Sequence, residues 1–170
     1  MIFVTVGTDE HPFVRLLEEI ENLIKTGIIR EDVVVQRGHT EFFSELFNEV
    51  YSFLPFDKFL NFMERANLVI THGGPGSIMI ALNFGKIPIV VPRRKEFGEH
   101  VDNHQVKFAE FLGEKGKIIP VYDVRNLKEI ISRYNRGIDD YRVKSENLGE
   151  NAEKFALKLD KICREVTDEG

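Results

Sequence analysis

The chain has 170 residues, of which 42% are hydrophobic and 30% are charged, and it carries a formal net charge of −5. This balance indicates a folded domain rather than a disordered chain, and the acidic charge argues against nucleic acid as a partner. Cys163 is the single cysteine, which excludes an intramolecular disulfide. No apolar run reaches the length of a transmembrane helix and no signal peptide is recognisable, so we expect a cytoplasmic protein.

Short apolar runs alternate with amphipathic segments over most of the chain. In order, the sequence predicts a strand at 2–6, a helix from 12 to 26, a strand at 33–36, a helix at 41–47, a strand at 50–54, a helix at 57–65, a strand at 68–71, a helix at 77–84, a strand at 87–91, a helix at 103–114, a strand at 118–121 and a helix at 127–134. Strands that are apolar throughout and alternate with helices are typical of a parallel sheet covered on both faces. We therefore predict an α/β fold with a doubly wound, Rossmann-like parallel sheet of about six strands.

The last part of the chain has a different pattern. A polar connector leads to apolar residues that recur at helical spacing in a charged background, namely Ala152, Phe155, Ala156, Leu159, Ile162, Cys163 and Val166. This spacing predicts a C-terminal amphipathic helix, which either packs on its own domain or serves as an interface. We expect residues 1–135 to form the sheet-containing unit, and residues 136–170 to form the connector and the helix of the same domain.

The first candidate site is the sequence VITHGGPGSIMI at residues 69–80. It follows the fourth predicted strand, and ligands of open parallel sheets bind beyond the carboxyl ends of the strands. Gly73, Gly74 and Gly76 allow a ligand to approach the backbone, and the helix that follows offers free N–H groups to a phosphate. A tight turn with Ser77 as a plain N-cap is the alternative. Neither a P-loop nor a GxGxxG motif is present.

The second candidate site is the polar segment 93–105, which follows the next strand. Arg93, Arg94 and Lys95 could neutralise a diphosphate, or they could belong to a solvated basic loop. His100 and His104 do not share a helical face with a third ligand, so no metal site is expected. The row from Asp102 to Gln105 suits the recognition of sugar hydroxyls, with helix capping as the alternative.

These motifs carry a family resemblance. The HGGPGS loop, the segment IPIVVPRRKEFGEHVDNHQ and the opening VTVGT together resemble the C-terminal domain of family 28 glycosyltransferases. The chain is most similar to the short stand-alone members, which include the cytosolic catalytic subunit of the dolichol-linked N-acetylglucosamine transferase and bacterial exopolysaccharide subunits. The resemblance implies one half of a GT-B fold, residues 1–135 as the part that binds the nucleotide sugar, and a UDP-sugar as donor substrate with no further cofactor.

The resemblance also implies roles for particular residues. Those implied to bind the diphosphate are His72, Gly74, Gly76 and Ser77, with Gly7 and Thr8 nearby. Those implied to contact the donor sugar are Asn103, His104 and Gln105, and the loop with Phe56 is implied to hold the uracil ring. The family commonly has a glutamate, which holds the ribose, at the position of Ile80. We therefore expect Glu96 or Glu99 to replace it, or the nucleotide affinity to be weaker.

The function expected from these features is donor binding and catalysis in a two-part inverting glycosyltransferase of polysaccharide or glycolipid biosynthesis. It would transfer a hexose or N-acetylhexosamine from a UDP-sugar to a lipid-linked sugar acceptor. His72, the helix N-terminus and Arg93 or Arg94 would stabilise the leaving diphosphate, and His11 and His104 are the candidates for a general base on this chain. The resemblance implies that a membrane-anchored partner subunit supplies the acceptor domain, so the chain would be peripheral to the cytoplasmic face of the membrane.

Two other readings stay open. The chain could be a regulatory module that binds nucleotide sugars without transferring them, which the isoleucine at position 80 favours. A sugar-nucleotide epimerase of related fold is a weaker alternative, because those enzymes normally carry both domains.

Overall fold

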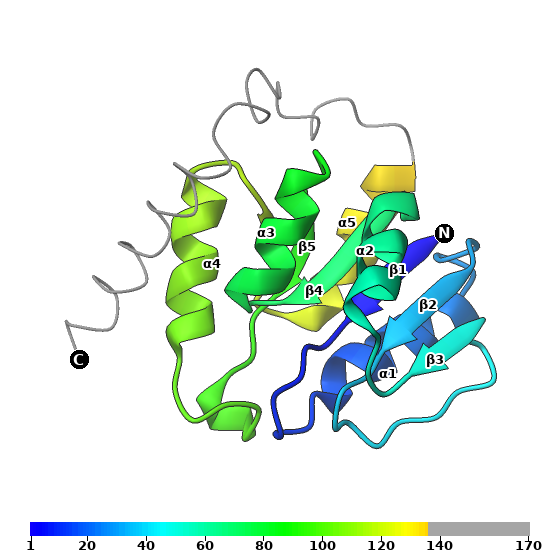
Figure 1. Cartoon of the computed structure of the whole chain (residues 1–170), viewed down its shortest axis with the longest axis horizontal. Coiled ribbons are helices and arrows are strands. Elements are labelled where there is room, and N and C mark those ends of the chain that lie inside the picture. The colour runs from blue at the N-terminus through cyan, green and yellow to red at the C-terminus, as the bar shows by residue number, and fades with distance from the viewer. Residues whose placement is uncertain (136–170) are drawn as a thin grey trace.

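The computed structural model describes residues 1–135, which form a single parallel sheet between helices (Figure 1). The strands are β1 (Ile2–Thr5), β2 (Val33–Gln36), β3 (Glu49–Tyr51), β4 (Leu68–His72), β5 (Ile89–Val91) and β6 (Ile119–Pro120). The helices are α1 (Val14–Lys25), α2 (Phe56–Arg65), α3 (Pro75–Asn83), α4 (His104–Glu114) and α5 (Leu127–Asn135), with short 3₁₀ turns η1 (Lys95–Phe97) and η2 (Val124–Asn126). The predicted doubly wound α/β fold is confirmed.

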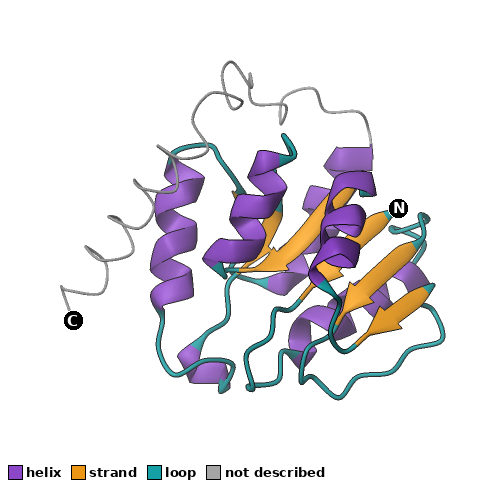
Figure 2. Ribbon diagram, in the orientation of Figure 1, coloured by secondary structure: helices purple, strands orange, loops and turns teal. Residues whose placement is uncertain are grey.

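The order of the strands fixes where a ligand can bind. The sheet runs β3-β2-β1-β4-β5-β6 and every neighbouring pair is parallel. The chain therefore leaves β1 toward one edge of the sheet and leaves β4 toward the other, which makes the β1–β4 boundary the switch point of the topology. At the carboxyl ends of these strands Thr5 pairs with Gln36 on one side and with Thr71 on the other. Figure 2 shows the strand arrows pointing toward the edge at which the long loops gather.

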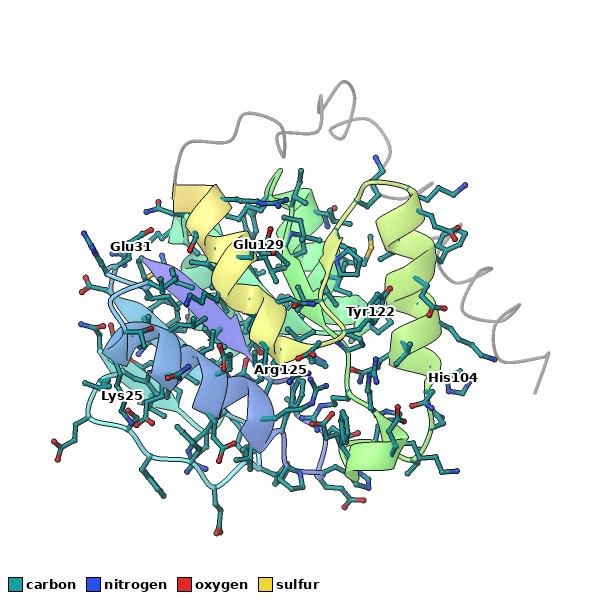
Figure 3. All side chains as sticks on the ribbon, turned by 180° about the vertical axis from the view of Figure 1, so that it is seen from behind. Lys25, Glu31, His104, Tyr122, Arg125 and Glu129 are labelled. Carbon is teal, nitrogen blue, oxygen red and sulfur yellow. The ribbon has the colours of Figure 1, made fainter. Side chains whose placement is uncertain are left out.

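Helices cover both faces of the sheet, as expected for strands that are apolar throughout. On one face α1 and α5 pack over alternate residues of the central strands, including Val4, Ile70 and Val91, and Figure 3 shows these two helices in front of the sheet. On the other face α2, α3 and α4 pack over the intervening residues, including Phe3 and Val90. This burial holds the strands rigid and so fixes the positions of the loops at their ends.

One predicted helix is wrong. Residues 41–47 form a loop between β2 and β3. A helix would place Phe43 and Phe47 on the same side, yet Phe47 is buried in the core and Phe43 is 80% exposed. The loop is held by its polar residues, because the Thr40 hydroxyl accepts a hydrogen bond from the backbone of Phe13 and Ser44 donates one to Glu21. Tertiary contacts thus override the helical spacing of the apolar residues.

The other elements lie within a few residues of their expected positions. The difference that matters is at α3, which begins at Pro75 rather than at residue 77. Proline is favoured in the first turn of a helix because its fixed φ suits the helix and its missing N–H is not needed there. The predicted amphipathic helix and connector lie outside the described residues, so their assignment to the same domain stays a prediction. None of the helices over residues 1–135 is long and apolar enough to cross a membrane.

Candidate functional site

A pocket of about 390 Å³ opens at the carboxyl edge of the sheet, at the β1–β4 switch point. Its lining comes from the ends of β1, β2 and β4, from the loop after β1, and from the beginnings of α2 and α3. The lining residues are Thr5, Gly7, Thr8, Gln36, Leu54, Phe56, Phe59, His72, Gly74, Pro75, Gly76, Ser77 and Ile80. The first turn of α3 therefore forms one wall, and its unpaired N–H groups and positive dipole end favour an anion there.

Most of the residues predicted for the diphosphate and the uracil lie together in this pocket. They are Gly7, Thr8, Phe56, His72, Gly74, Gly76 and Ser77. Ser77 is the third residue of α3, and its side chain forms no capping hydrogen bond, since Gly74 is the N-cap residue. The alternative reading of Ser77 as a plain N-cap is therefore wrong.

Gly74, and Gly7 in the loop after β1, leave space for the ring of His72. A Cβ atom on Gly74 would lie 2.1 Å from Nε2 of His72, and a Cβ on Gly7 would lie 2.5 Å from the same atom. Gly7 has a φ of 81°, but Gly73, Gly74 and Gly76 do not have positive φ angles. The need for glycine at position 74 is therefore steric, because the imidazole lies directly against the backbone.

His72 is uncharged at neutral pH. Its side chain is almost fully buried, and burial together with the nearby Arg93 guanidinium lowers the pKa of His72 from 6.5 to about 4. A neutral imidazole can make one hydrogen bond as donor and one as acceptor, but it brings no positive charge to the pocket. The expectation that His72 is one of the positive groups is therefore corrected, and the N-terminus of α3 remains as the electropositive element of the pocket.

Two polar lining residues, Thr5 and Gln36, were missed in the sequence. The Thr5 hydroxyl donates to Oε1 of Gln36 over 3.1 Å and accepts a hydrogen bond from the backbone N–H of Gly7 over 3.2 Å. Both side chains are buried, and each is the last residue of an otherwise apolar strand. The sequence signal that could have identified both residues is a polar residue at the carboxyl end of a buried strand. The pair holds the loop after β1 against the floor of the pocket.

The opposite end of the pocket is apolar. Phe56 is 67% exposed, and Leu54, Phe59 and Ile80 line the pocket with it. An exposed aromatic ring at the rim of an apolar wall suits the face of a planar heterocycle. Ile80 is half-buried and lines the pocket, and it also packs against the apolar cluster of α2 and α3, so the position that commonly carries a glutamate in family 28 borders both the site and the core.

Arg93 and Glu99 do not line the pocket. The Arg93 side chain is fully buried and donates to three backbone carbonyls, those of Val6 over 2.7 Å, His11 over 2.6 Å and Glu99 over 2.9 Å. The Glu99 carboxylate is buried in an ion pair with Arg15, at 2.6 Å between Nε and Oε1. These bonds join the loops after β1 and β5. We therefore replace the predicted nucleotide contacts of Arg93 and Glu99 with structural roles.

The three residues predicted to contact the sugar lie at the start of α4, outside the pocket lining. Gln105 is buried, and its Oε1 accepts hydrogen bonds from the backbone N–H groups of Gly73 and Arg93, which ties α4 to the two loops. Asn103 accepts a hydrogen bond from the backbone of Lys95. His104 has an exposed side chain at the beginning of α4 (Figure 3). Of the three, Asn103 and His104 present surface to a ligand, whereas Gln105 is buried.

The two histidines predicted as candidate bases have the same local structure. Asp9 accepts the backbone N–H of His11 over 2.9 Å and lies 2.7 Å from its Nδ1, while Asp102 accepts the backbone N–H of His104 over 3.0 Å and lies 2.6 Å from its Nδ1. His100 lies between the two aspartates, 3.7 Å from Asp9 and 3.1 Å from Asp102. Nearby positive groups and the hydrogen bonds from the histidines lower the pKa of both carboxyl groups despite some burial. Within residues 1–135 no cluster of three or more suitable side chains is arranged to hold a metal ion.

Comparison with known proteins gives a family match over nearly the whole chain. The family model described as glycosyltransferase family 28 C-terminal domain matches residues 1–162. A similar curated protein is the UDP-N-acetylglucosamine transferase subunit ALG13 of Yarrowia lipolytica, which is 35% identical over 129 residues. The match covers 70% of this chain and 63% of the yeast protein, so somewhat more than a third of that relative has no counterpart in the match.

A solved structure supports the fold. The glycotransferase of kitacinnamycin superposes with a TM-score of 0.60 at 19% sequence identity, and the match covers 100% of this chain but 40% of that one. At this identity the likeness concerns the fold alone. It agrees with a chain that corresponds to one of the two Rossmann-like halves of a GT-B glycosyltransferase.

Proposed function

The chain belongs to the glycosyltransferase family 28 C-terminal domains. On this basis we propose that it is the donor-binding subunit of a two-part, UDP-sugar-dependent glycosyltransferase. The observation that carries the proposal is the pocket at the β1–β4 switch point, where the first turn of α3 faces the glycine loop after β1. Such a pocket suits a nucleoside diphosphate, with its anionic part at the helix N-terminus and its planar base at an apolar end.

The diphosphate is proposed to lie between the loop of Gly7 and Thr8 and the first turn of α3. There the backbone N–H groups of α3 and the Ser77 hydroxyl are available as donors, and the absence of a Cβ on Gly76 allows close approach. The uracil is proposed to lie on Phe56, and the donor sugar to extend toward His104 at the start of α4. In direct displacement at the anomeric carbon, the fixed dipole of α3 would stabilise the charge on the departing diphosphate.

The acceptor is proposed to be a lipid-linked sugar held by a second, membrane-anchored subunit, with this chain in the cytoplasm at the membrane face. The yeast relative is by name a subunit, and the solved structure that resembles this chain is more than twice as long. Large apolar side chains on the loops after β3 and β5 support a partner at this edge, because Phe53, Phe97 and Val101 are between 50% and 64% exposed. An acceptor domain facing the pocket would cover them.

Calorimetry with UDP and a panel of UDP-sugars tests the donor site. We expect UDP to bind the isolated chain, UDP-hexoses or UDP-N-acetylhexosamines to raise its melting temperature, and UMP to bind more weakly because it lacks the β-phosphate. The control variant Lys25→Ala, on the far part of α1, should bind as the wild type does. Absence of UDP binding, or equal affinity for UMP and UDP, would reject the proposed diphosphate site.

A nucleotide-sugar-binding regulatory module is the second candidate, and the observation that favours it is Ile80 on the pocket wall. Without a carboxylate for the ribose, the pocket could retain donors weakly and serve as a sensor. Reconstitution with the membrane subunit separates the two candidates. Transfer of the sugar to a lipid-linked acceptor supports the enzyme, whereas donor binding without transfer by the reconstituted pair supports the regulatory module.

A further inference from the structure

The loops after β1 and β5 are joined by an alternating row of imidazoles and carboxylates. In spatial order the row is His11, Asp9, His100, Asp102 and His104. Each end of the row is an Asp-x-His turn in which the carboxylate contacts Nδ1 of the histidine two residues later. The nucleotide pocket does not use these side chains, since none of them lines it.

We infer that His11, held by Asp9, is the general base that takes the proton from the attacking hydroxyl of the acceptor. The inference rests on the proposed function and assigns to this chain a step that the family resemblance left to the missing half. Because Asp9 accepts a hydrogen bond from Nδ1, the proton of the neutral ring stays on that nitrogen and the lone pair of Nε2 is free. A base oriented by a carboxylate at its other nitrogen is a recurring arrangement in acyl and group transfer.

The geometry favours His11 over the other histidines of the row. Oδ1 of Asp9 bonds both the ring and the backbone of His11, and the Arg93 guanidinium holds the His11 carbonyl at 2.6 Å. His11 therefore has a fixed backbone and a fixed ring. The His100 ring accepts a hydrogen bond at Nδ1 from the backbone N–H of Asp102 over 3.3 Å, and its Nε2 faces the Asp9 carboxylate at 3.7 Å, so neither nitrogen is directed at an open site.

The position of the loop favours a role next to the donor. Thr8 lines the nucleotide pocket and precedes Asp9 directly, and the negative charge of Asp9 acts on the imidazole of His72 inside the pocket. The His11–Asp9 pair thus follows the proposed diphosphate site directly along the chain, and His100 and Asp102 connect it to the start of α4, toward which the donor sugar is proposed to extend. The anomeric carbon is bonded to the β-phosphate oxygen, so it belongs to this same region.

The step balances without a further reactant. The acceptor oxygen forms a bond to the anomeric carbon as its proton moves to Nε2 of His11. The bond between the anomeric carbon and the β-phosphate oxygen breaks, and its electron pair leaves with UDP. Asp9 stabilises the imidazolium that results, and the proton is lost to solvent before the next turnover. Asp9 is in this scheme a positioning residue, and His11 is the catalytic one.

The test uses the chain reconstituted with its membrane subunit and lipid-linked acceptor, and compares His11→Gln, His104→Gln and Lys25→Ala. His11→Gln should lower kcat by about 10²- to 10⁴-fold while the affinity for UDP-sugar stays within about twofold. His104→Gln should instead weaken donor binding, and Lys25→Ala, at the end of α1 away from the pocket lining, should behave as the wild type. Turnover of His11→Gln within threefold of the wild type, or a fall in donor affinity that matches the fall in turnover, would overturn the inference.

A second measurement needs no partner. The ¹⁵N shifts of the His11 ring in the isolated chain should show a proton on Nδ1 in the neutral form, and Asp9→Ala should return the ring to the Nε2-protonated tautomer that predominates in free histidine. A proton on Nε2 in the wild type would exclude His11 as the general base regardless of the kinetic results, because Nε2 would then have no lone pair to accept the proton. The two ways of failing can be told apart. If the proposed function is wrong, the wild type does not bind UDP. If only the role of His11 is wrong, the wild type binds UDP and transfers the sugar, and the His11→Gln variant does so equally well.

Discussion

Nε2 of His72 lies against the backbone of Gly74, so closely that a Cβ on that glycine would be 2.1 Å from it. The same nitrogen lies close to Gly7, where a Cβ would be 2.5 Å away. The imidazole is thus in contact with both the loop after β1 and the loop that begins α3, the two backbone segments that form the proposed diphosphate site.

Gly74→Ala should lower both stability and nucleotide affinity. The added methyl group cannot fit beside a buried ring, so the loop or His72 must move, at a cost of about 1–3 kcal/mol in the free energy of unfolding. Gly76→Ala is the matched control for stability, because a Cβ there meets no atom within 4 Å and alanine is favoured in a helix. Urea unfolding and UDP calorimetry measure the two effects. Equal stability of the two variants would contradict the steric role of Gly74.

The buried neutral His72 should make stability depend on pH. Its pKa is about 4 in the folded chain and 6.5 as a free side chain, so between these values the unfolded chain binds the proton first. The free energy of unfolding should therefore fall as the pH drops from 6.5 to 4, by about 3 kcal/mol from this group, and this contribution should change no further below pH 4.

The measurement is urea unfolding at several pH values for the wild type, His72→Asn and His39→Asn. His39 is exposed, so its replacement should leave the pH dependence of the wild type in place. His72→Asn should be less stable at pH 7 but should lose much less stability on acidification. If its curve runs parallel to that of the wild type, His72 is not the group that titrates.

Arg93→Lys should destabilise the fold without removing the nucleotide. An ammonium group cannot reach the three carbonyls that the planar guanidinium joins, so buried acceptors lose their partners, and we expect a loss of about 2–4 kcal/mol. Arg94→Lys is the control, since that side chain is partly exposed and its one ion pair, with Glu96, is at the surface. UDP affinity measured well below the melting temperature should stay within about twofold. A tenfold loss of UDP affinity in Arg93→Lys would instead indicate that Arg93 contacts the nucleotide.

Arg93 also illustrates what the sequence could and could not predict. The sheet was predictable because the four buried strands β1, β2, β4 and β5 are short, mainly apolar runs between breaks, and that pattern depends on burial on both faces. The sequence Arg93-Arg94-Lys95 reads equally as a cationic loop, and nothing local separates the buried arginine from its exposed neighbours. Its partners, the carbonyls of Val6 and His11, lie more than eighty residues away in the chain.

The same limit applies to the two Asp-x-His turns. Asp9 and His11, and likewise Asp102 and His104, are close in sequence, so each pair could have been proposed from the Asx-turn chemistry of aspartate. Their connection through His100 could not, because it depends on the neighbouring positions of β1, β4 and β5 in the sheet. The glycine-rich segment 73–76 was predictable as a site. The steric need for Gly74 was not, because it depends on the position of the His72 ring.

Ile80→Glu should tighten UDP binding with little change in stability. Ile80 is half-buried and lines the pocket near the apolar end proposed for the base, so a carboxylate there can remain hydrated and accept hydrogen bonds from ribose hydroxyls. Ile80→Gln is the matched control, because it has the same length and lacks the charge. Calorimetry should give Ile80→Glu a several-fold higher affinity than both Ile80→Gln and the wild type, corresponding to about 1 kcal/mol. Should the glutamate variant instead melt far below the glutamine variant and gain no affinity, the packing of Ile80 against the apolar cluster of α2 and α3 would be its main role, and the ribose would have to be recognised by other residues.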